Sequence, residues 1–375
     1  MKITLKNTPE QVELVKAMAS RNRDVAYEAQ TALAEFIGPV LAEVVNNAPV
    51  LSNLFTTLQY NSDDNPSIPL DLYYDVTDQD YVQVYSQSRA GGLPTSEVHP
   101  TSSELKIATY SIDSAVSFDR RYAAKSRMDV VAKTMTRVAQ EILLKQNTIS
   151  ANVVMKALGA ATTNTLSHVL PVTSAGRFTL ADLNELMTRS KRISTSFVGG
   201  TPDVGQGRGI TDILVSPEIV EELRAIAYNP INTKGAANGV AAGTSHTATS
   251  APVQTADVIA QQAYSAAGAP EFYGINVIEL NELGHVDSTS QSFNSVFKAN
   301  YAGSFTETSQ QIVVGIDRGR DSLVRPVAVD SESGGEFNLI ADDQYSIRQS
   351  KIGYFGSLEE GRIVLDDRAL VGKIV

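Results

Sequence analysis

The sequence predicts an α+β protein built around a long extended arm, on two observations. Residues 101–158 contain no glycine and no proline, and they pass from a strand pattern into a long amphipathic helix. Immediately before them, residues 89–94 read Arg-Ala-Gly-Gly-Leu-Pro, which is a strong turn signal. The chain is therefore expected to run out along one strand, reverse at an exposed tip and return. An arm that its own subunit cannot bury favours a self-assembling structural protein over an enzyme.

Composition narrows the function classes. The 375 residues are 42% hydrophobic, which allows a real core, and they carry a formal net charge of −11. A net negative chain gains little on a phosphate backbone, so a dedicated nucleic-acid binder is disfavoured. With no cysteine, disulfides and thiolate metal sites are excluded. The four histidines include no i, i+4 pair, and we expect no metal, cofactor or catalytic residue.

The N-terminal 9–47 segment is expected to be helical. Pro9 suits the first helical position with Thr8 as its cap, and Gly38-Pro39 should kink or break the helix. The first ten residues lack the apolar core of a signal peptide, and no apolar run reaches the roughly 18 residues that a membrane span needs. We therefore expect no membrane partner.

The arm itself is predicted from alternation. Residues 67–85 place Ile68, Leu70 and Leu72 on one face with Tyr74 and Val76, which indicates a half-buried strand. A second extended segment spans 104–118, and its inward face changes near Ala108, as at a bulge. One long helix is then expected from Asp119 to Leu158, about 60 Å at 1.5 Å per residue. Such a helix is typical of a coiled coil or of a spine across a sheet, and the preceding strands favour the spine.

After Gly159 the pattern is that of an α/β domain. A helix is predicted at 180–193 with Thr179 as its cap, and a buried strand at 212–215 leads through Ser216-Pro217 into another helix. The remaining elements are a loop at 228–252, a helix at 255–267, and strands at 275–280, 311–316, 323–329, 344–355, 362–364 and 369–375.

Motifs that could carry chemistry are weak. The glycine-rich stretch 199–209 lacks the Gly-Lys-Ser/Thr ending of a phosphate loop, and the acidic set Asp71, Asp75, Asp78 and Asp80 lacks the pattern of a calcium loop. No Gly-x-Ser-x-Gly elbow is present, although a triad of distant residues stays open. The basic cluster 189–192 is explained by the end of a helix.

The order of these elements resembles the major capsid proteins of tailed bacteriophages, whose Hong Kong ninety-seven-type fold encapsulins share. The residues that carry the resemblance are Ile213-Leu-Val-Ser-Pro-Glu-Ile-Val220, 344–355 as the last long strand, and 366–375 as the closing segment. The resemblance is one of architecture over nearly the whole chain. It implies an N-terminal arm at 1–53, an extended E-loop hairpin at 54–117, a peripheral domain with spine helix at 118–160 plus 341–375, and an axial domain at 161–340.

The resemblance also implies a function and partners. The chain would form pentamers and hexamers of an icosahedral shell around phage double-stranded DNA, which it would touch non-specifically. It would be a virion protein, assembled in the host bacterial cytoplasm with a separate scaffolding protein, a portal and in some cases a cement protein. The expected inter-subunit assembly residues of the E-loop are Ile68, Leu70, Leu72, Arg89, Gly91, Gly92, Leu93, Pro94 and Glu97.

Two departures from the family pattern matter. Some members carry a cleavable N-terminal scaffold that is longer than the arm expected here at 1–53, so scaffolding is expected from a separate protein. Some members crosslink covalently through an E-loop lysine, whereas this chain has no lysine between Lys16 and Lys106. Any contact of the arm with a neighbouring subunit should therefore be non-covalent. Three other readings stay open at this point: an encapsulin-like cargo nanocompartment, a phage tail structural protein, and a hydrolase.

Overall fold

The computed structural model resolves the chain into two compact units with interleaved sequence. The first comprises Met1–Tyr74, Glu97–Ala151 and Leu323–Ile363, and the second comprises Asp75–Ser96, Asn152–Ser322 and Val364–Val375. The structure describes residues 8–47, 51–61, 64–69, 86, 91–92, 104–125, 128–161, 166–194, 209–228, 271–272, 274–286, 289–290, 292–329, 336–342 and 350–375.

Strand β14 (Lys351–Gly361) organises the sheet of the first unit. It pairs antiparallel with β4 (Thr109–Asp119) over its whole length, from Lys351 opposite Asp119 to Gly361 opposite Thr109. β13 (Asn338–Asp342) and β12 (Leu323–Val329) pair with its other edge, and β1 (Thr56–Asn61) adds in parallel to β12. The short β15 (Ile363–Val364) also pairs with β12.

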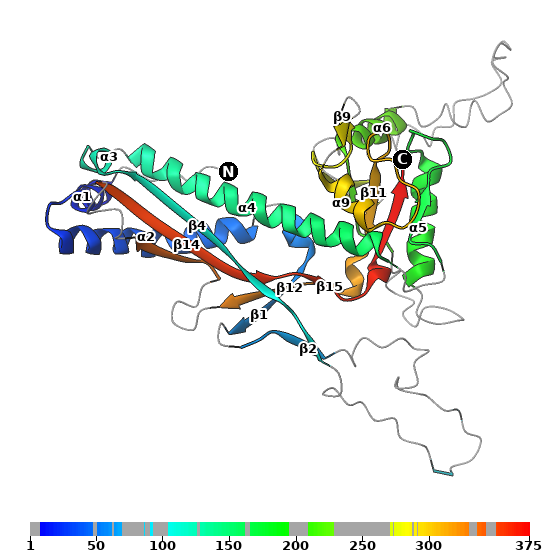
Figure 1. The fold of residues 1–375 in the computed structure, drawn as a ribbon, viewed down its shortest axis with the longest axis horizontal. Helices are drawn as coiled ribbons and strands as arrows, with labels where there is room; N and C mark the ends of the chain where they lie inside the picture. Colours follow the sequence, from blue (N-terminus) through cyan, green and yellow to red (C-terminus); the bar gives the residue numbers. More distant parts are fainter. Residues whose placement is uncertain are drawn as a thin grey trace. The chain divides into compact units, whose positions relative to one another are not determined.

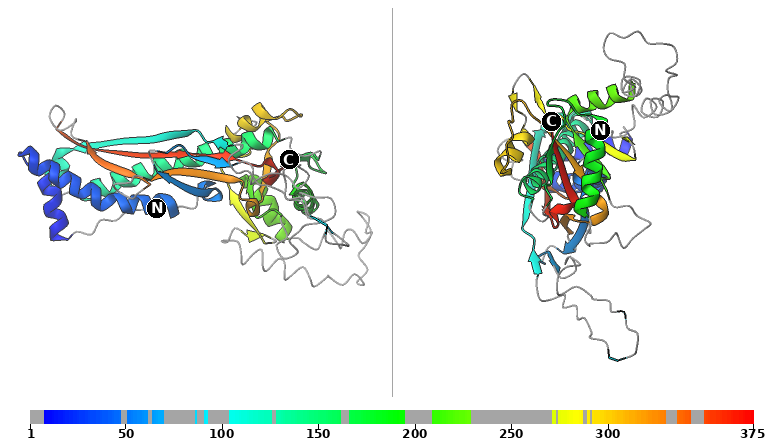
Figure 2. Two further views of the ribbon diagram at one scale, coloured as in Figure 1. Left: turned by 90° about the horizontal axis from the view of Figure 1, so that it is seen from below. Right: turned by 90° about the vertical axis from the view of Figure 1, so that its right-hand side faces the viewer.

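Helices cover one face of this sheet, as Figures 1 and 2 show. α4 (Met128–Gly159) has 32 residues, about 48 Å at 1.5 Å per residue, and runs along β4 and β14. Its buried Val131, Met135 and Ile142 share a core with Tyr354 of β14. α1 (Pro9–Met18) and α2 (Arg23–Asn47) contribute to the same core. The apolar stripes of three helices thus meet the inward side chains of one sheet.

A short strand pair forms the base of the predicted hairpin. β2 (Ser67–Pro69) and β3 (Glu104–Lys106) pair antiparallel, with Ile68 opposite Leu105. The chain breaks from strand geometry at 107–108 before β4 begins, which confirms the predicted change near Ala108. The bounds of the outgoing strand beyond Pro69 lie outside the described residues.

The second unit has its own sheet, in the order β5-β16-β11-β6-β8-β7. Its strands are β5 (Val169–Pro171), β16 (Leu370–Ile374), β11 (Ile312–Ile316), β6 (Asp212–Val215), β8 (Ile275–Glu279) and β7 (Glu271–Phe272). α5 (Leu180–Ser194) and α6 (Pro217–Tyr228) pack on it through Leu186 and Ile219. α9 (Ser292–Asn300), the pair β9 (His285–Val286) and β10 (Thr289–Ser290), and single turns η3 (Arg318–Arg320) and η4 (Asp367–Ala369) complete the described elements of this unit.

Two predicted helix boundaries are wrong. The N-terminal helix breaks at Ser20–Asn22 and not at Gly38-Pro39, because Ser20 Oγ and Asn22 Oδ1 accept the backbone N–H groups of Asn22 and Asp24. α2 continues through Pro39. Glu35, whose carbonyl loses its partner to the proline, and Pro39 itself are exposed, so water can satisfy that carbonyl.

The spine is likewise shorter than predicted. Asp119 caps a separate five-residue helix, α3 (Arg120–Ala124), by accepting from the Arg121 N–H at 2.9 Å. α4 begins only at Met128. Lys125 is the C-cap of α3, with its N–H donating to the Arg121 carbonyl at 3.2 Å, and residues 126–127 lie outside the described residues.

The last long strand ends later than predicted. The sequence predicts it at 344–355, of which 344–349 lie outside the described residues, and β14 continues to Gly361. Gly356, which reads as a turn residue, is needed inside the strand because a Cβ there would lie 2.5 Å from the Phe337 ring. β1, β5, β13 and α9 were not predicted. Residues 229–252 of the predicted loop and the predicted 255–267 helix lie outside the described residues, and Tyr228 is the last residue of α6.

Candidate assembly surfaces and the ionic clusters behind them

The expected assembly residues fall mostly outside the described chain. Leu70, Leu72, Arg89, Leu93, Pro94 and Glu97 are among the undescribed residues. Gly91 and Gly92 are exposed, and Gly92 has φ +63°, the left-handed conformation that a tight turn takes from glycine. Ile68 is 6% exposed, so its own chain already covers it and it offers little side-chain surface to a second copy.

A buried ionic cluster lies behind the hairpin base; we call Glu360 with Arg325 and Arg362 the Glu360 cluster. Glu360 is fully buried and accepts from Arg325 Nε at 2.7 Å and from Arg362 Nη2 at 2.8 Å. Gln146 Nε2 and the Tyr110 hydroxyl also donate to it, at 3.2 and 3.0 Å. Four donors on one carboxylate offset much of its burial cost. The cluster joins β4, β12, β14 and α4 at one point.

Arg362 extends this cluster to η1 (Leu51–Leu54). Its Nη2 donates to Ser52 Oγ at 2.7 Å, and its guanidinium lies 5.7 Å from the centre of the Phe55 ring. Its Nη1 donates to the Gln146 carbonyl and to Ser150 Oγ on α4. Burial lowers the pKa of Arg362, and the neighbouring Glu360 and Tyr110 oppose that effect. The chain entering β1 is therefore fixed to the spine helix.

The carboxylate one residue earlier, Glu359, links β14 to β1 and β4. Glu359 accepts from the Tyr60 hydroxyl at 3.2 Å and from Thr109 Oγ1 at 2.8 Å. Burial raises the pKa of Tyr60, and burial raises that of Tyr110 strongly. Both phenols stay protonated near neutral pH, so they act as hydrogen-bond donors and not as bases.

A second cluster, the Lys373 cluster, stabilises the second unit. The fully buried Lys373 ammonium lies 3.3 Å from Asp182 Oδ1 and also pairs with Glu185, whose side chain is half exposed. Asp182 accepts further from the backbone N–H and hydroxyl of both Thr173 and Thr179. Burial raises the pKa of Asp182, but the hydrogen bonds from Thr179, Thr173 and Lys373 outweigh it and lower the pKa to about 2.

Two apolar surfaces of the first unit are left uncovered. On the sheet face opposite the helices, Ala115, Phe355 and Ile340 lie in register across β4, β14 and β13; we call them the outer row. Phe355 is 36% and Ile340 47% exposed. On α2, Phe36 and Val40, one turn apart, are 54% and 41% exposed; we call them the α2 stripe. Apolar groups that gather in this way mark sites of association more often than single exposed residues do.

Other sequence candidates carry no chemistry in the described chain. Lys191 and Arg192 lie in the last turn of α5, as predicted, and Met135 is core. The stretch 199–208 and the four aspartates 71–80 lie outside the described residues. The part of the chain that the structure describes holds no group of three or more side chains placed to bind a metal. None of its helices combines the length and the apolarity of a membrane span.

Sequence reasoning missed the Glu360 cluster. Its members are far apart in the chain: Ser52 and Arg362 are separated by 310 residues, and Gln146 and Glu360 by 214. One signal existed, because Glu359-Glu-Gly-Arg362 places three charges directly after the largely apolar stretch 352–358. Charges at such a position need partners, although the sequence does not say which.

Comparisons with known proteins give matches by structure alone. No protein-family model matches the chain, and neither does any curated protein sequence. The capsid of cyanophage P-SCSP1u is similar over 87% of this chain and 88% of its own, with 13% identity and a TM-score of 0.45. A virus-like particle from Pyrococcus furiosus covers 91% and 99%, with 12% identity and a TM-score of 0.42.

The encapsulin SrpI of Synechococcus elongatus is also similar, over 72% of this chain and 75% of its own, with 13% identity and a TM-score of 0.38. These proteins are of the class that the sequence resemblance indicates.

Proposed function

We propose that this chain is a major capsid protein of a tailed bacteriophage, which self-assembles into pentamers and hexamers of an icosahedral shell around double-stranded DNA. The observation that supports the proposal best is the way in which the base of the hairpin is anchored to the rest of its subunit. β3 leads into β4, β4 pairs along all of β14, and the Glu360 cluster fixes both strands to α4. A hairpin anchored in this way can transmit force from a neighbouring subunit to its own, a property that an isolated monomer would not use.

The uncovered surfaces supply the second argument. The outer row and the α2 stripe lie on different elements, so two different neighbours can cover them at once. Contacts between unlike patches close into rings when the rotation between copies closes. A strand edge that a second copy covers is also protected from uncontrolled pairing. The same subunit can then serve in rings of five and of six.

The domain assignment belongs to this proposal. Residues 1–53 form the N-terminal arm, 54–117 the E-loop, 118–160 with 341–375 the peripheral domain, and 161–340 the axial domain. The division into compact units falls between Ile363 and Val364, inside the last of the peripheral segments. The E-loop tip contacts a neighbouring subunit without a covalent link, since the arm has no lysine.

The proposal includes a place and partners. The chain is a virion protein assembled in the bacterial cytoplasm, with a separate scaffolding protein, a portal and in some cases a cement protein. Its net charge of −11 keeps the shell from binding packaged DNA tightly, so contact with DNA is non-specific. It has no catalytic role and needs no cofactor or membrane.

The proposal is tested by purifying the chain and a variant that lacks residues 88–98, and by examining both by sedimentation and electron microscopy. The full chain should form closed shells, and the deletion should leave folded subunits that form none. Normal shells from the deletion variant would refute the role of the tip. Tubes would indicate a tail protein, and shells found beside a cargo gene, without portal and terminase genes, would indicate a nanocompartment.

A further inference from the structure

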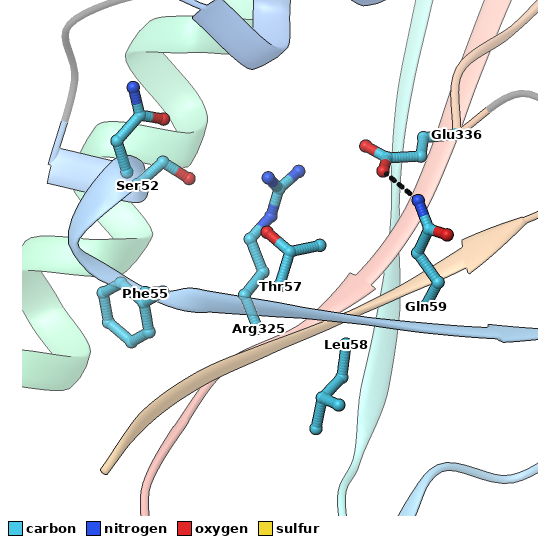
Figure 3. Close-up of a pocket in the computed structure, with 8 residues that line it drawn as sticks. Ser52, Phe55, Thr57, Leu58, Gln59, Arg325 and Glu336 are labelled. Atoms are coloured by element: carbon cyan, nitrogen blue, oxygen red, sulfur yellow. Dashed lines mark hydrogen bonds between the residues drawn. The ribbon is translucent and has the colours of Figure 1, made fainter. Parts of the chain in front are cut away.

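A cleft of about 460 Å³ opens beside the Glu360 cluster, entirely within the first unit. Ser52 and Phe55 come from the η1 region, Thr57 and Gln59 from β1, Arg325 from β12, and Glu336 lies just before β13. Figure 3 shows the Arg325 guanidinium rising beside the Thr57 side chain, while Glu336 turns toward Gln59. The cleft therefore has a cationic group in its wall.

That cation is under-partnered. Arg325 is 5% exposed and its Nε donates to Glu360, but its Nη2 has no hydrogen-bond partner among the described residues. Arg325 and Arg362 also share the single carboxylate of Glu360, which leaves one buried positive charge in excess. Glu336 accepts from Gln59 at 3.1 Å instead of pairing with Arg325. A buried cation with an unused hydrogen-bond donor is stabilised when an anion binds to it.

The side chains that line the cleft favour a carboxylate as the ligand. A planar guanidinium presents parallel N–H donors that match the two oxygens of a carboxylate. Ser52 Oγ already accepts from Arg362, so its own hydroxyl proton is free to be donated toward a ligand. The rim of the cleft is formed by exposed residues of β1 such as Thr57, so a segment of another chain can reach it.

Charge complementarity favours one source for this carboxylate. Residues 70–88 contain four aspartates, Asp71, Asp75, Asp78 and Asp80, and no lysine or arginine. We propose that the Arg325 cleft binds an aspartate from this acidic stretch of a second copy of the chain. The inference rests on the proposed function and deepens it, because it assigns a defined non-covalent socket to the arm of a neighbouring subunit.

The test uses zero-length carbodiimide coupling, which joins an amine to a carboxylate in contact with it. Thr57→Lys places the first lysine between Lys16 and Lys106, at the mouth of the cleft. Asn61→Lys, on the same strand but outside the cleft, is the matched control. Both are made in a Glu336→Gln background so that the rim carboxylate does not compete. Shells are assembled from a mixture of ¹⁵N-labelled and unlabelled chains.

The expected product is a crosslinked peptide pair of mixed isotope label, joining position 57 to one of the four aspartates. Its yield should exceed that from position 61 at least tenfold. The inference is overturned if shells give no such pair, if every pair carries a single isotope label and is therefore intrachain, or if both positions react equally. Failure of the unsubstituted chain to form shells would instead refute the proposed function.

A second variant covers the case in which Thr57→Lys subunits do not assemble. Thr57→Trp fills the cleft and leaves Arg325 and Glu360 untouched, and Asn61→Trp is its control. Shells of the first should fall apart at least ten times faster in salt than unsubstituted shells, and those of the second at the unsubstituted rate. Equal lifetimes for all three would overturn the inference.

Discussion

The two buried ionic clusters have opposite charge balance. The Glu360 cluster has two guanidiniums around one carboxylate, all three largely buried, and one Arg325 nitrogen without a partner. The Lys373 cluster has one ammonium between two carboxylates, and the surplus carboxylate, Glu185, is half exposed to water. Water can therefore balance the surplus charge of the second cluster, whereas the surplus charge of the first lies in the wall of the Arg325 cleft. The second cluster stabilises the fold of its unit, and we propose that the first also binds a neighbouring subunit.

The largest expected effect is at the centre of the first cluster. Glu360→Gln leaves Arg325 and Arg362 buried without a counter-charge, which should cost about 3–5 kcal/mol of unfolding free energy. Denaturant unfolding of the unassembled subunit measures it. Glu104→Gln, on an exposed position of β3, should change stability by less than about 0.5 kcal/mol. A loss below about 1 kcal/mol for Glu360→Gln would show that the cluster does not anchor the sheet.

The second cluster should tolerate loss of its cation better. Lys373→Met removes the charge but leaves Asp182 with four hydrogen bonds and Glu185 in contact with water, so we expect a cost of about 2–3 kcal/mol. The same unfolding assay measures it. Lys298→Met, which breaks an exposed pair with Glu307 at 3.4 Å, should cost no more than about 1 kcal/mol. If Lys373→Met lost more unfolding free energy than Glu360→Gln, the Lys373 cluster and not the Glu360 cluster would be the more sensitive to loss of its central charge.

Acid should distinguish the clusters as well. The pKa of Asp182 is lowered to about 2 in the fold, against about 3.9 in an unfolded chain, so its contribution of about 2.5 kcal/mol is complete above pH 4. That contribution is lost as the pH falls from 4 through 2. Asp182→Asn should therefore flatten the stability profile across this window, and the exposed Glu221→Gln should not. Parallel profiles for Asp182→Asn and the unsubstituted chain would contradict the assigned pKa.

The smallest effect on the subunit should come from its uncovered surface. Phe36→Ser with Val40→Ser should change the unfolding free energy of the unassembled subunit by less than about 0.5 kcal/mol, since both side chains are largely in water. Assembly, followed by light scattering, should be lost or strongly slowed. Glu28→Ser with Ala32→Ser, on exposed positions one turn apart in the same helix, controls for helix propensity. Normal assembly of the Phe36→Ser, Val40→Ser variant would show that the α2 stripe is not part of the interface.

Local signals in the sequence were sufficient for some elements. β6 and β12 have the predicted bounds, 212–215 and 323–329. The α5 cap is also as predicted, with Thr179 Oγ1 accepting from the Asp182 N–H at 3.3 Å, and Ser216 caps α6 in the same way. In each case an apolar run or a capping side chain acts within four residues, so the pattern contains the whole cause.

Other elements depend on distant partners. β1 reads Thr-Thr-Leu-Gln-Tyr-Asn, with almost every side chain exposed, and it is a strand because β12 pairs with it. β14 continues past Gly356 because Phe337, immediately before β13, fills the space above that glycine. The assembly residues were predicted by resemblance, whereas Arg325 was missed because its carboxylate lies 35 residues away in sequence.

Single-particle electron microscopy of shells formed by the purified chain tests the central claim most directly, because it shows which copy each hairpin contacts. The account predicts a closed shell of five- and six-membered rings, in which the hairpin that leaves β2 and β3 of one subunit lies on a neighbour. A purified chain that stays monomeric, forms open tubes, or folds the hairpin onto its own subunit would contradict it.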